Sequence, residues 1–157
     1  MLHVPFVRQK ADHLCGPAVL QMVYRYFGRS VTQRRFERIL KTSKRFGTSR
    51  SELIRVARAD GFSVYASHRV NLRKIDAFLK KKLPVIVNYV EPSDEEGHYA
   101  VAIGVTKTAV ILNDPWNGRS FSMPRREFLK RWRGATPAGT RYGRWIMVLS
   151  RDTSITQ

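Results

Sequence analysis

Cys15 is the only cysteine in this sequence of 157 residues, and it directly precedes a stretch with the apolar spacing of a helix. Because the chain offers no second cysteine, Cys15 has no intramolecular disulfide partner. A helix start presents free backbone N–H groups and the positive end of the helix dipole. Both favour the thiolate, which is the reactive form of cysteine. Cys15 is therefore a candidate nucleophile, although a single cysteine is most often a small buried hydrophobic residue.

Two residues farther along the sequence could assist such a nucleophile. Acyl transfer by a cysteine needs a base that shares its proton and a group that orients this base. His98 stands at the start of a strand-like segment, residues 99–105, and Asp114 stands at the end of the next one, residues 109–113. Each also fits an ordinary role, since an Asp before a proline is typical of a turn and a His at a strand start is commonly half exposed.

The hairpin between these two segments determines whether His98 and Asp114 can meet. A three-residue turn over residues 106–108 would place Val105 opposite Ala109. Asp114 would then lie on the same face of the sheet as His98, in a diagonal cross-strand position within reach of a side-chain pair. A two-residue turn would put the two side chains on opposite faces. The catalytic interpretation therefore predicts the three-residue turn.

The elements that must position these residues are helices in the first half of the chain and strands in the second. Residues typical of helix starts are, in order, Pro17, Ser30 or Thr32, Ser49 with Glu52, and Asn71. Segments of strand length are 62–66, 84–89, 99–105, 109–113, 119–122 and 145–149, with a helix over 124–132. This order predicts an α+β fold with N-terminal helices packed on a C-terminal antiparallel sheet, in one domain over residues 1–157.

The formal net charge is +17, from 29 Lys and Arg against 12 Asp and Glu. Such a charge predicts attraction to polyanions or to acidic substrates. The basic residues match no nucleic-acid-binding motif, so a salt-sensitive basic surface is favoured over a dedicated nucleic-acid site, although the charge does not exclude nucleic acid as a partner. No apolar run approaches the roughly 18 residues of a membrane span. The N-terminus shows no basic region followed by an apolar stretch, so we expect no secretory signal and a cytoplasmic location.

The remaining titratable residues suggest no further chemistry. His3, His13 and His68 have no metal-ligand spacing with Cys15, so we expect neither a metal nor a cofactor. The acidic residues 94–96 are interpreted as a solvated loop, which would favour a charged imidazole if it lay near His98.

Several segments, taken in order, resemble the bacteriocin-processing cysteine peptidases. These segments are Gln9, Cys-Gly-Pro-Ala at 15–18, His-Tyr-Ala-Val-Ala-Ile-Gly at 98–104, and Asn-Asp-Pro-Trp-Asn-Gly at 113–118. The similarity extends from Val4 to Leu149, which is nearly the whole chain. Members of this family are papain-like enzymes that cut leader peptides after a double glycine, often as the N-terminal domain of an export transporter.

The resemblance implies a papain-like fold and a cysteine peptidase that hydrolyses peptide bonds through a Cys-His-Asp triad and an acyl-enzyme. It makes Cys15 the nucleophile, His98 its general base and acid, and Asp114 the group that orients His98. Gln9 would donate to the oxyanion, together with the backbone N–H of Cys15. The implied partners are a peptide or protein substrate and, because the sequence carries no transporter domain, a separate export transporter. Family members commonly have Asp directly before the cysteine, where this chain has Leu14.

Two other functions stay open at this point. One is a non-catalytic peptide-binding domain of the same fold, and the other is a basic nucleic-acid-binding domain, which only the net charge suggests. The joint presence of Cys15, His98, Asp114 and Gln9 favours the enzyme, because together they supply each role that acyl transfer needs.

Overall fold

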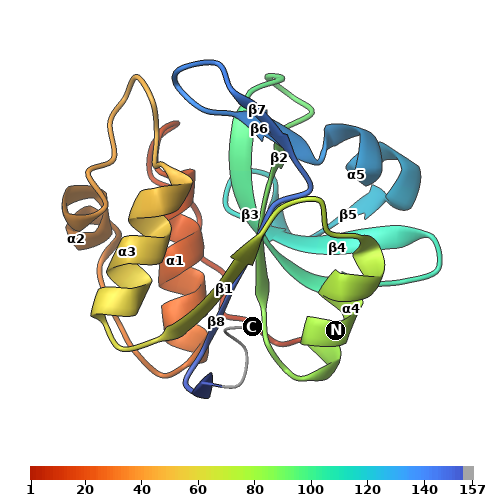
Figure 1. Cartoon of the computed structure of the whole chain (residues 1–157), viewed down its shortest axis with the longest axis horizontal. Helices are drawn as coiled ribbons and strands as arrows, with labels where there is room; N and C mark the ends of the chain where they lie inside the picture. The colour runs from red at the N-terminus through yellow and green to blue at the C-terminus, as the bar shows by residue number, and fades with distance from the viewer. Residues whose placement is uncertain (154–157) are drawn as a thin grey trace.

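In the computed structural model, which describes residues 1–153, five helices pack around a six-stranded sheet. The helices are α1 (Cys15–Tyr26), α2 (Gln33–Ile39), α3 (Arg50–Ala59), α4 (Leu72–Lys80) and α5 (Arg125–Arg131). Figure 1 shows α1, α2 and α3 together on one side of the sheet and α4 and α5 on the other. The last four residues of the expected 1–157 domain lie outside the described part. Up to residue 153, no helix is long and apolar enough to cross a membrane.

Three helices begin at capping residues that the sequence predicts. The side-chain oxygens of Thr32, Ser49 and Asn71 each accept a hydrogen bond from the backbone N–H three residues later, at 2.9 to 3.2 Å. These bonds satisfy N–H groups that have no acceptor inside the helix. Helix α1 has no side-chain cap and begins two residues before Pro17, so Cys15 is its first residue.

The neighbouring strands of the main sheet are all antiparallel, which confirms the predicted α+β arrangement. In spatial order the strands are β1 (Ser63–Ser67), β8 (Ile146–Ser150), β2 (Val85–Val90), β3 (Gly97–Val105), β4 (Ala109–Asp114) and β5 (Gly118–Pro124). Strand β8, near the C-terminal end, lies between β1 and β2 and so joins both halves of the chain in one sheet. The buried apolar side chains of this sheet and of α1 form the core.

A second, two-stranded sheet is present that the sequence analysis did not predict. It pairs β6 (Arg133–Ala135) with β7 (Arg141–Gly143), and the hairpin packs against β2. The Tyr142 hydroxyl donates a hydrogen bond of 2.7 Å to Asn88 Oδ1 on β2. A Cβ at Gly134 would lie 2.5 Å from both of these side chains. Gly134 therefore allows the hairpin to approach the main sheet closely.

The turn between β3 and β4 is longer than predicted. Val105 pairs with Val110, so the predicted pairing of Val105 with Ala109 is wrong. The turn is closed by a hydrogen bond of 2.8 Å from Thr106 N to the Ala109 carbonyl. This one-residue offset, continued along the strands, would move every paired side chain to the other face.

A β-bulge in β3 restores the register that the site needs. The pairing shifts between Ala102 and Gly104, so that one residue, Ile103, is extra on β3 and Val101 pairs with Asn113. A bulge of this kind changes which face the following side chains point to. Continued to the strand ends, the shifted register brings His98 and Asp114 to one face of the sheet.

The first turn of α1 lies close to the segment that precedes α3. A Cβ at Gly16 would be 2.3 Å from the Thr48 hydroxyl oxygen. Thr48 is itself fixed, because its hydroxyl lies 2.7 Å from the Thr42 hydroxyl and its carbonyl accepts a hydrogen bond of 2.8 Å from Tyr99 on β3. The close contact at Gly16 therefore helps to determine where the neighbouring Cys15 lies relative to β3.

Replacing Gly16 with Ala is expected to lower the free energy of unfolding by about 1–3 kcal/mol, because the added methyl group forces Thr48 to move. The loss would occur although Ala is favoured over Gly inside a helix by about 0.5–1 kcal/mol. Urea unfolding measures it, with Gly143→Ala as control, since a Cβ at Gly143 would meet no atom within 4 Å. If Gly16→Ala and Gly143→Ala had the same free energy of unfolding, the close contact between Gly16 and Thr48 would be contradicted.

Candidate active site

A buried hydrogen bond joins His98 to Asp114. His98 Nε2 lies 2.8 Å from Asp114 Oδ1, and the two residues are 6% and 0% exposed. His98 is the second residue of β3 and Asp114 is the last residue of β4, so the bulged hairpin brings them together. Because Nε2 faces the carboxylate, Nδ1 is the ring nitrogen that remains for a second partner.

Three further donors surround the carboxylate of Asp114. The Tyr89 hydroxyl donates a hydrogen bond to Oδ2, and the backbone N–H groups of Trp116 and Asn117 each donate to Oδ1 at 2.9 Å. Burial by itself raises the pKa of Asp114, but the hydrogen bond from His98, the charge of that residue and the other donors hold it below its ordinary value. Asp114 is therefore a charged carboxylate at neutral pH.

The charge of His98 depends on Cys15 as well as on Asp114. Burial by itself lowers the pKa of His98, but hydrogen bonds to Asp114 and to Cys15, together with the negative charges of both, raise it to about 10. The imidazole is therefore protonated at neutral pH while it contacts both groups. The imidazole on β3 is thus hydrogen-bonded to the carboxylate at the end of β4 and is influenced by the negative charge of Cys15 at the start of α1.

The thiol opens onto a cleft of about 430 Å³. Cys15 is 8% exposed, and the segments that share the lining of this cleft with it are 12–13, 44–47, 96–97 and 135–137. The walls therefore come from the loop before α1, the loop before α3, the start of β3 and the β6–β7 hairpin. A substrate in this cleft would contact four separate parts of the chain.

Gln9 lies in the loop that leads to α1 and is 7% exposed. Its Nε2 donates hydrogen bonds to the carbonyls of Ala11 at 2.9 Å and Asp12 at 3.2 Å, and its buried Oε1 has no hydrogen-bond partner among residues 1–153. The backbone N–H of Gln9 donates to the Pro115 carbonyl at 3.0 Å, which ties this loop to the turn after Asp114. The structure thus brings Gln9 to the site region with its amide turned toward its own loop.

Sequence analysis missed the residues that support Asp114. Tyr89 lies opposite His98 on β2, and a tyrosine inside a buried aliphatic strand was a usable signal, because its hydroxyl needs a partner. Glu91, only 2% exposed, accepts a hydrogen bond of 2.9 Å from the Asn117 side chain, and Asn117 in turn donates to Asp114. A second buried carboxylate therefore fixes the turn that holds the first.

Two other charged residues near the cleft have ion-pair partners of their own. His13 Nε2 lies 2.9 Å from Glu37 Oε2 on α2, and Glu95, from the predicted acidic loop, pairs with Arg131 at 3.0 Å. Across residues 1–153, no group of three or more His, Cys, Asp or Glu side chains could hold a metal ion. The reactive groups of the site are thus the Cys15 thiol, which lines the cleft, and the His98 imidazole held by Asp114.

A helix that carries the thiol at its first residue, packed on an antiparallel sheet that supplies the imidazole and the carboxylate, is the arrangement of papain-like cysteine peptidases. The fold and the site of this protein have the features of that class. Residues 3–136, most of the chain, match the Peptidase C39 family. The chain belongs to this family, and its function as a cysteine-type peptidase is thereby confirmed, whereas the roles of individual residues stay predictions.

Solved structures share the fold over nearly the whole chain. The peptidase domain of Streptococcus ComA, a bifunctional ABC transporter involved in quorum sensing, is 22% identical with a TM-score of 0.73, covering 96% of this chain and 100% of that one. A double glycine motif protease from an AMS/PCAT transporter, solved with the leader peptide, is 21% identical with a TM-score of 0.72, covering 94% and 91%. A putative C39-like peptidase from Bacillus anthracis is 16% identical with a TM-score of 0.71, covering 96% of each. A comparison with curated proteins gave no match.

Replacing Tyr89 with Phe removes the hydroxyl that donates to Asp114 and leaves one oxygen of a buried carboxylate without its donor. The free energy of unfolding at pH 7 is expected to fall by about 1–3 kcal/mol, as for other buried hydrogen bonds to charged groups. Urea unfolding measures the change. Tyr65→Phe is the matched control, because the Tyr65 hydroxyl on β1 makes no hydrogen bond with any residue up to 153. Wild-type stability of Tyr89→Phe would argue against the bond.

The raised pKa of His98 makes stability depend on pH. In the unfolded chain His98 loses its proton near its ordinary value of 6.5, whereas in the folded protein it keeps the proton up to about pH 10. The stabilisation is therefore complete below pH 6.5 and is lost as the pH rises toward 10. We expect the difference in unfolding free energy between wild type and His98→Gln to shrink over this range, as measured by urea unfolding at stepped pH. A difference that grows with pH would show that His98 is neutral in the folded protein.

Proposed function

We propose that Cys15, His98 and Asp114 are the catalytic triad of this peptidase. The observation that carries the proposal is the buried hydrogen bond between His98 and Asp114, with the Cys15 thiol at the edge of a cleft and near enough to raise the pKa of His98. Asp114 orients the imidazole and stabilises its positive charge, and His98 takes the proton of the Cys15 thiol. The resulting thiolate is the nucleophile.

In the proposed reaction, the Cys15 thiolate attacks the carbonyl carbon of the scissile peptide bond, and the electron pair of the C=O bond moves to oxygen. The N–H groups at the start of α1 have no acceptor inside the helix and can donate to this oxyanion. His98 then gives its proton to the leaving amine as the carbon–nitrogen bond breaks. A water molecule, deprotonated by His98, hydrolyses the thioester and releases Cys15 for the next cycle.

Gln9 is the second oxyanion donor in this proposal. Its Nε2 donates two hydrogen bonds, one of 2.9 Å to the Ala11 carbonyl and a longer one of 3.2 Å to the Asp12 carbonyl. Exchanging the longer bond for a bond to the oxyanion would leave the shorter one in place. Catalytic hydrogen bonds are often unformed before the substrate binds, so the orientation in the free protein is compatible with this role.

The proposed substrates are the leader peptides of exported peptides, cut after a double glycine. Support comes from the similar fold of the AMS/PCAT protease, which was solved with a leader peptide. The proposed partner is a separate export transporter, since similar peptidase domains belong to ABC transporters. We place the reaction in the cytoplasm, where thiols such as Cys15 stay reduced.

The test is cleavage of a double-glycine leader peptide by wild type and by variants of the four residues. Cys15→Ala is expected to release no product, and Gln9→Ala to lower kcat by about a hundredfold to a thousandfold, as for other oxyanion-hole donors. Iodoacetamide should still label Cys15 rapidly in Gln9→Ala, because Gln9 takes no part in forming the thiolate. Gln9→Glu, which keeps the shape of the side chain but loses the NH₂ donor, is the matched variant.

Two outcomes would contradict the assignments. Product release by Cys15→Ala would show that Cys15 is not the nucleophile, and full kcat in both Gln9 variants would remove Gln9 from the oxyanion hole. Binding of the peptide by wild type without any product would indicate a non-catalytic peptide-binding domain.

A further inference from the structure

Beside the thiol cleft lies a larger cavity of about 580 Å³. The two spaces share five lining residues, two from the loop before α3 and three from the end of β6 and the turn after it: Phe46, Gly47, Ala135, Thr136 and Pro137. The two spaces therefore form one groove between this loop and the β6–β7 hairpin. A peptide whose scissile bond lies at Cys15 can extend along the groove into the larger cavity.

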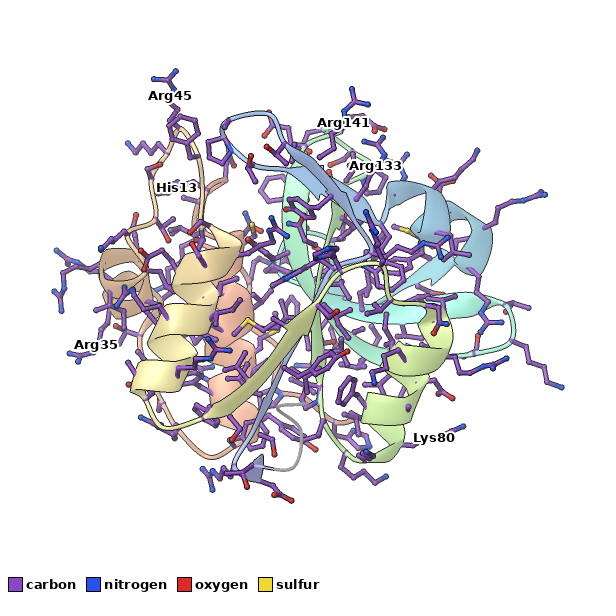
Figure 2. The ribbon with its side chains drawn as sticks, viewed as in Figure 1. His13, Arg35, Arg45, Lys80, Arg133 and Arg141 are labelled. Atoms are coloured by element: carbon purple, nitrogen blue, oxygen red, sulfur yellow. The ribbon has the colours of Figure 1, made fainter. Side chains whose placement is uncertain are left out.

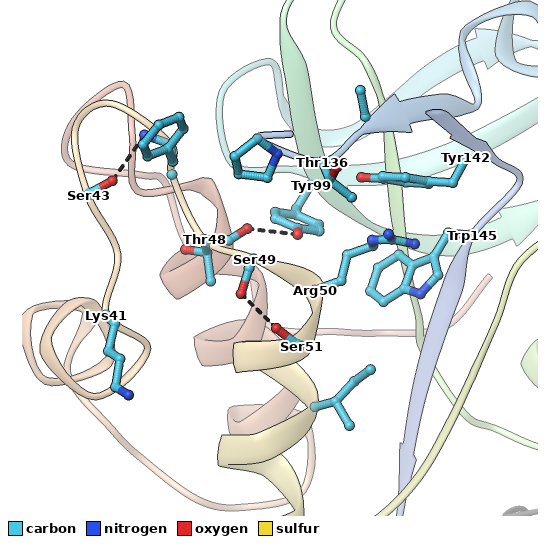
Figure 3. A pocket seen from close by; sticks show the side chains of 15 residues that line it. Lys41, Ser43, Thr48, Ser49, Arg50, Ser51, Tyr99, Thr136, Tyr142 and Trp145 are labelled. Atoms are coloured by element: carbon cyan, nitrogen blue, oxygen red, sulfur yellow. Dashed lines mark hydrogen bonds between the residues drawn. The ribbon is translucent and has the colours of Figure 1, made fainter. Parts of the chain in front are cut away.

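Arg50, the first residue of α3, extends into the larger cavity. Its guanidinium carbon lies 3.4 Å from the centroid of the Tyr142 ring and 6.0 Å from that of Trp145. Figure 3 shows the side chain reaching from the start of the helix toward these two rings. Because the Tyr142 hydroxyl is hydrogen-bonded to Asn88 on β2, the ring that supports the guanidinium is itself held in place. Stacking on a ring occupies the face of a guanidinium and leaves the N–H donors at its edge available.

No acidic group within the described chain satisfies these donors. Among residues 1–153, none accepts a hydrogen bond from Arg50 or forms an ion pair with it, and the described lining of its cavity includes Lys41 but no Asp or Glu. Arg55 and Arg131, by contrast, are each hydrogen-bonded to glutamate side chains. Arg50 thus combines a fixed orientation with a charge that no carboxylate of the described chain neutralises.

Tyr99 is influenced by the charges of both Arg50 and Cys15. It lines the larger cavity and donates a hydrogen bond of 2.8 Å to the Thr48 carbonyl. Burial raises the pKa of Tyr99, the negative charge of Cys15 raises it further, and the positive charge of Arg50 lowers it. Both Cys15 and Arg50 are therefore near enough to Tyr99 to influence its ionisation.

Further arginines are exposed on the two segments that form the groove. Figure 2 shows Arg45 at the tip of the loop before α3, and Arg133 and Arg141 on the opposite hairpin, along the same edge of the molecule. All three are exposed. Exposed charges of this kind accelerate the approach of an acidic ligand but give little selectivity, because solvent screens them.

We propose that Arg50 binds a carboxylate of the substrate peptide, so that the groove selects peptides with an Asp or Glu at a fixed distance from the scissile bond. A guanidinium can hold a carboxylate through two parallel hydrogen bonds, which an amide cannot replace. This specificity rests on the proposed peptidase function and concerns the same groove. It assigns to Arg50 a role in choosing the substrate and none in the chemical step.

The test moves a single Glu, or a Gln in its place, through an otherwise neutral peptide that the wild type cleaves. At one position we expect kcat/KM to be about tenfold to a hundredfold higher for Glu than for Gln, the range for hydrogen bonds to charged groups. Arg50→Gln should abolish this preference, so that the Glu and Gln peptides are cleaved with the same kcat/KM. Arg50→Lys, which keeps the charge but loses the planar fork, should retain only part of the preference.

Arg35→Gln is the matched control, because it removes the same charge from α2, where Figure 2 shows Arg35 on the side away from the hairpin. It should leave the preference for Glu intact. The proposal is overturned if no position prefers Glu, if the preference survives in Arg50→Gln, or if that variant loses activity equally on both peptides. If wild type cleaves no peptide at all, the proposed function fails instead, so the two failures can be distinguished.

Discussion

The carboxylate of Asp114 has no exposed surface, and the geometry of the site depends on keeping it charged. Moving an ion of this size out of water costs several kcal/mol even after the protein relaxes, so it must be compensated by donors. The donors are the His98 ring, the Tyr89 hydroxyl, and the backbone N–H groups of Trp116 and Asn117. They come from β2, from β3 and from the turn after β4. Three neighbouring segments must therefore be correctly aligned before the charge is stable.

This requirement explains the irregular hairpin between β3 and β4. A one-residue change in pairing reverses the faces of a strand, and the long turn makes one such change. The bulge at Ile103 makes a second, so that His98 again points to the same face as Asp114. Either irregularity alone would separate the imidazole from the carboxylate. The sequence-based prediction gave the wrong turn length but still placed His98 and Asp114 on one face of the sheet. The reason is that the shift in the turn and the shift at the bulge cancel, which leaves the side chains near the site on the predicted face.

What could be predicted from the sequence depended on how far apart the interacting residues are. Helix caps at Thr32, Ser49 and Asn71 were predictable because donor and acceptor are three residues apart. The β6–β7 hairpin was not, because its strands have only three residues each and lack an alternating apolar pattern. It is held by contacts of Gly134 and Tyr142 with β2, more than forty positions earlier in the chain. Such contacts leave no periodic signal.

The same limit applies to the net charge of +17, which as a number could not separate one basic residue from another. In the structure, the basic residues differ in which side chains they contact. Arg131 is engaged by Glu95 and Glu127, and Arg45 lies exposed at a loop tip, where pairing gains little over water. Arg50 lies 3.4 Å from the centroid of the half-buried Tyr142 ring, whereas Arg45 lies 4.9 Å from that of the exposed Phe46 ring, so only the ring beside Arg50 is itself fixed. A cation discriminates between ligands only when its position is fixed before binding and its donors are free, because otherwise the ligand must displace a partner or order a mobile side chain. The overall charge therefore governs how fast acidic ligands approach, while selection among them falls to Arg50.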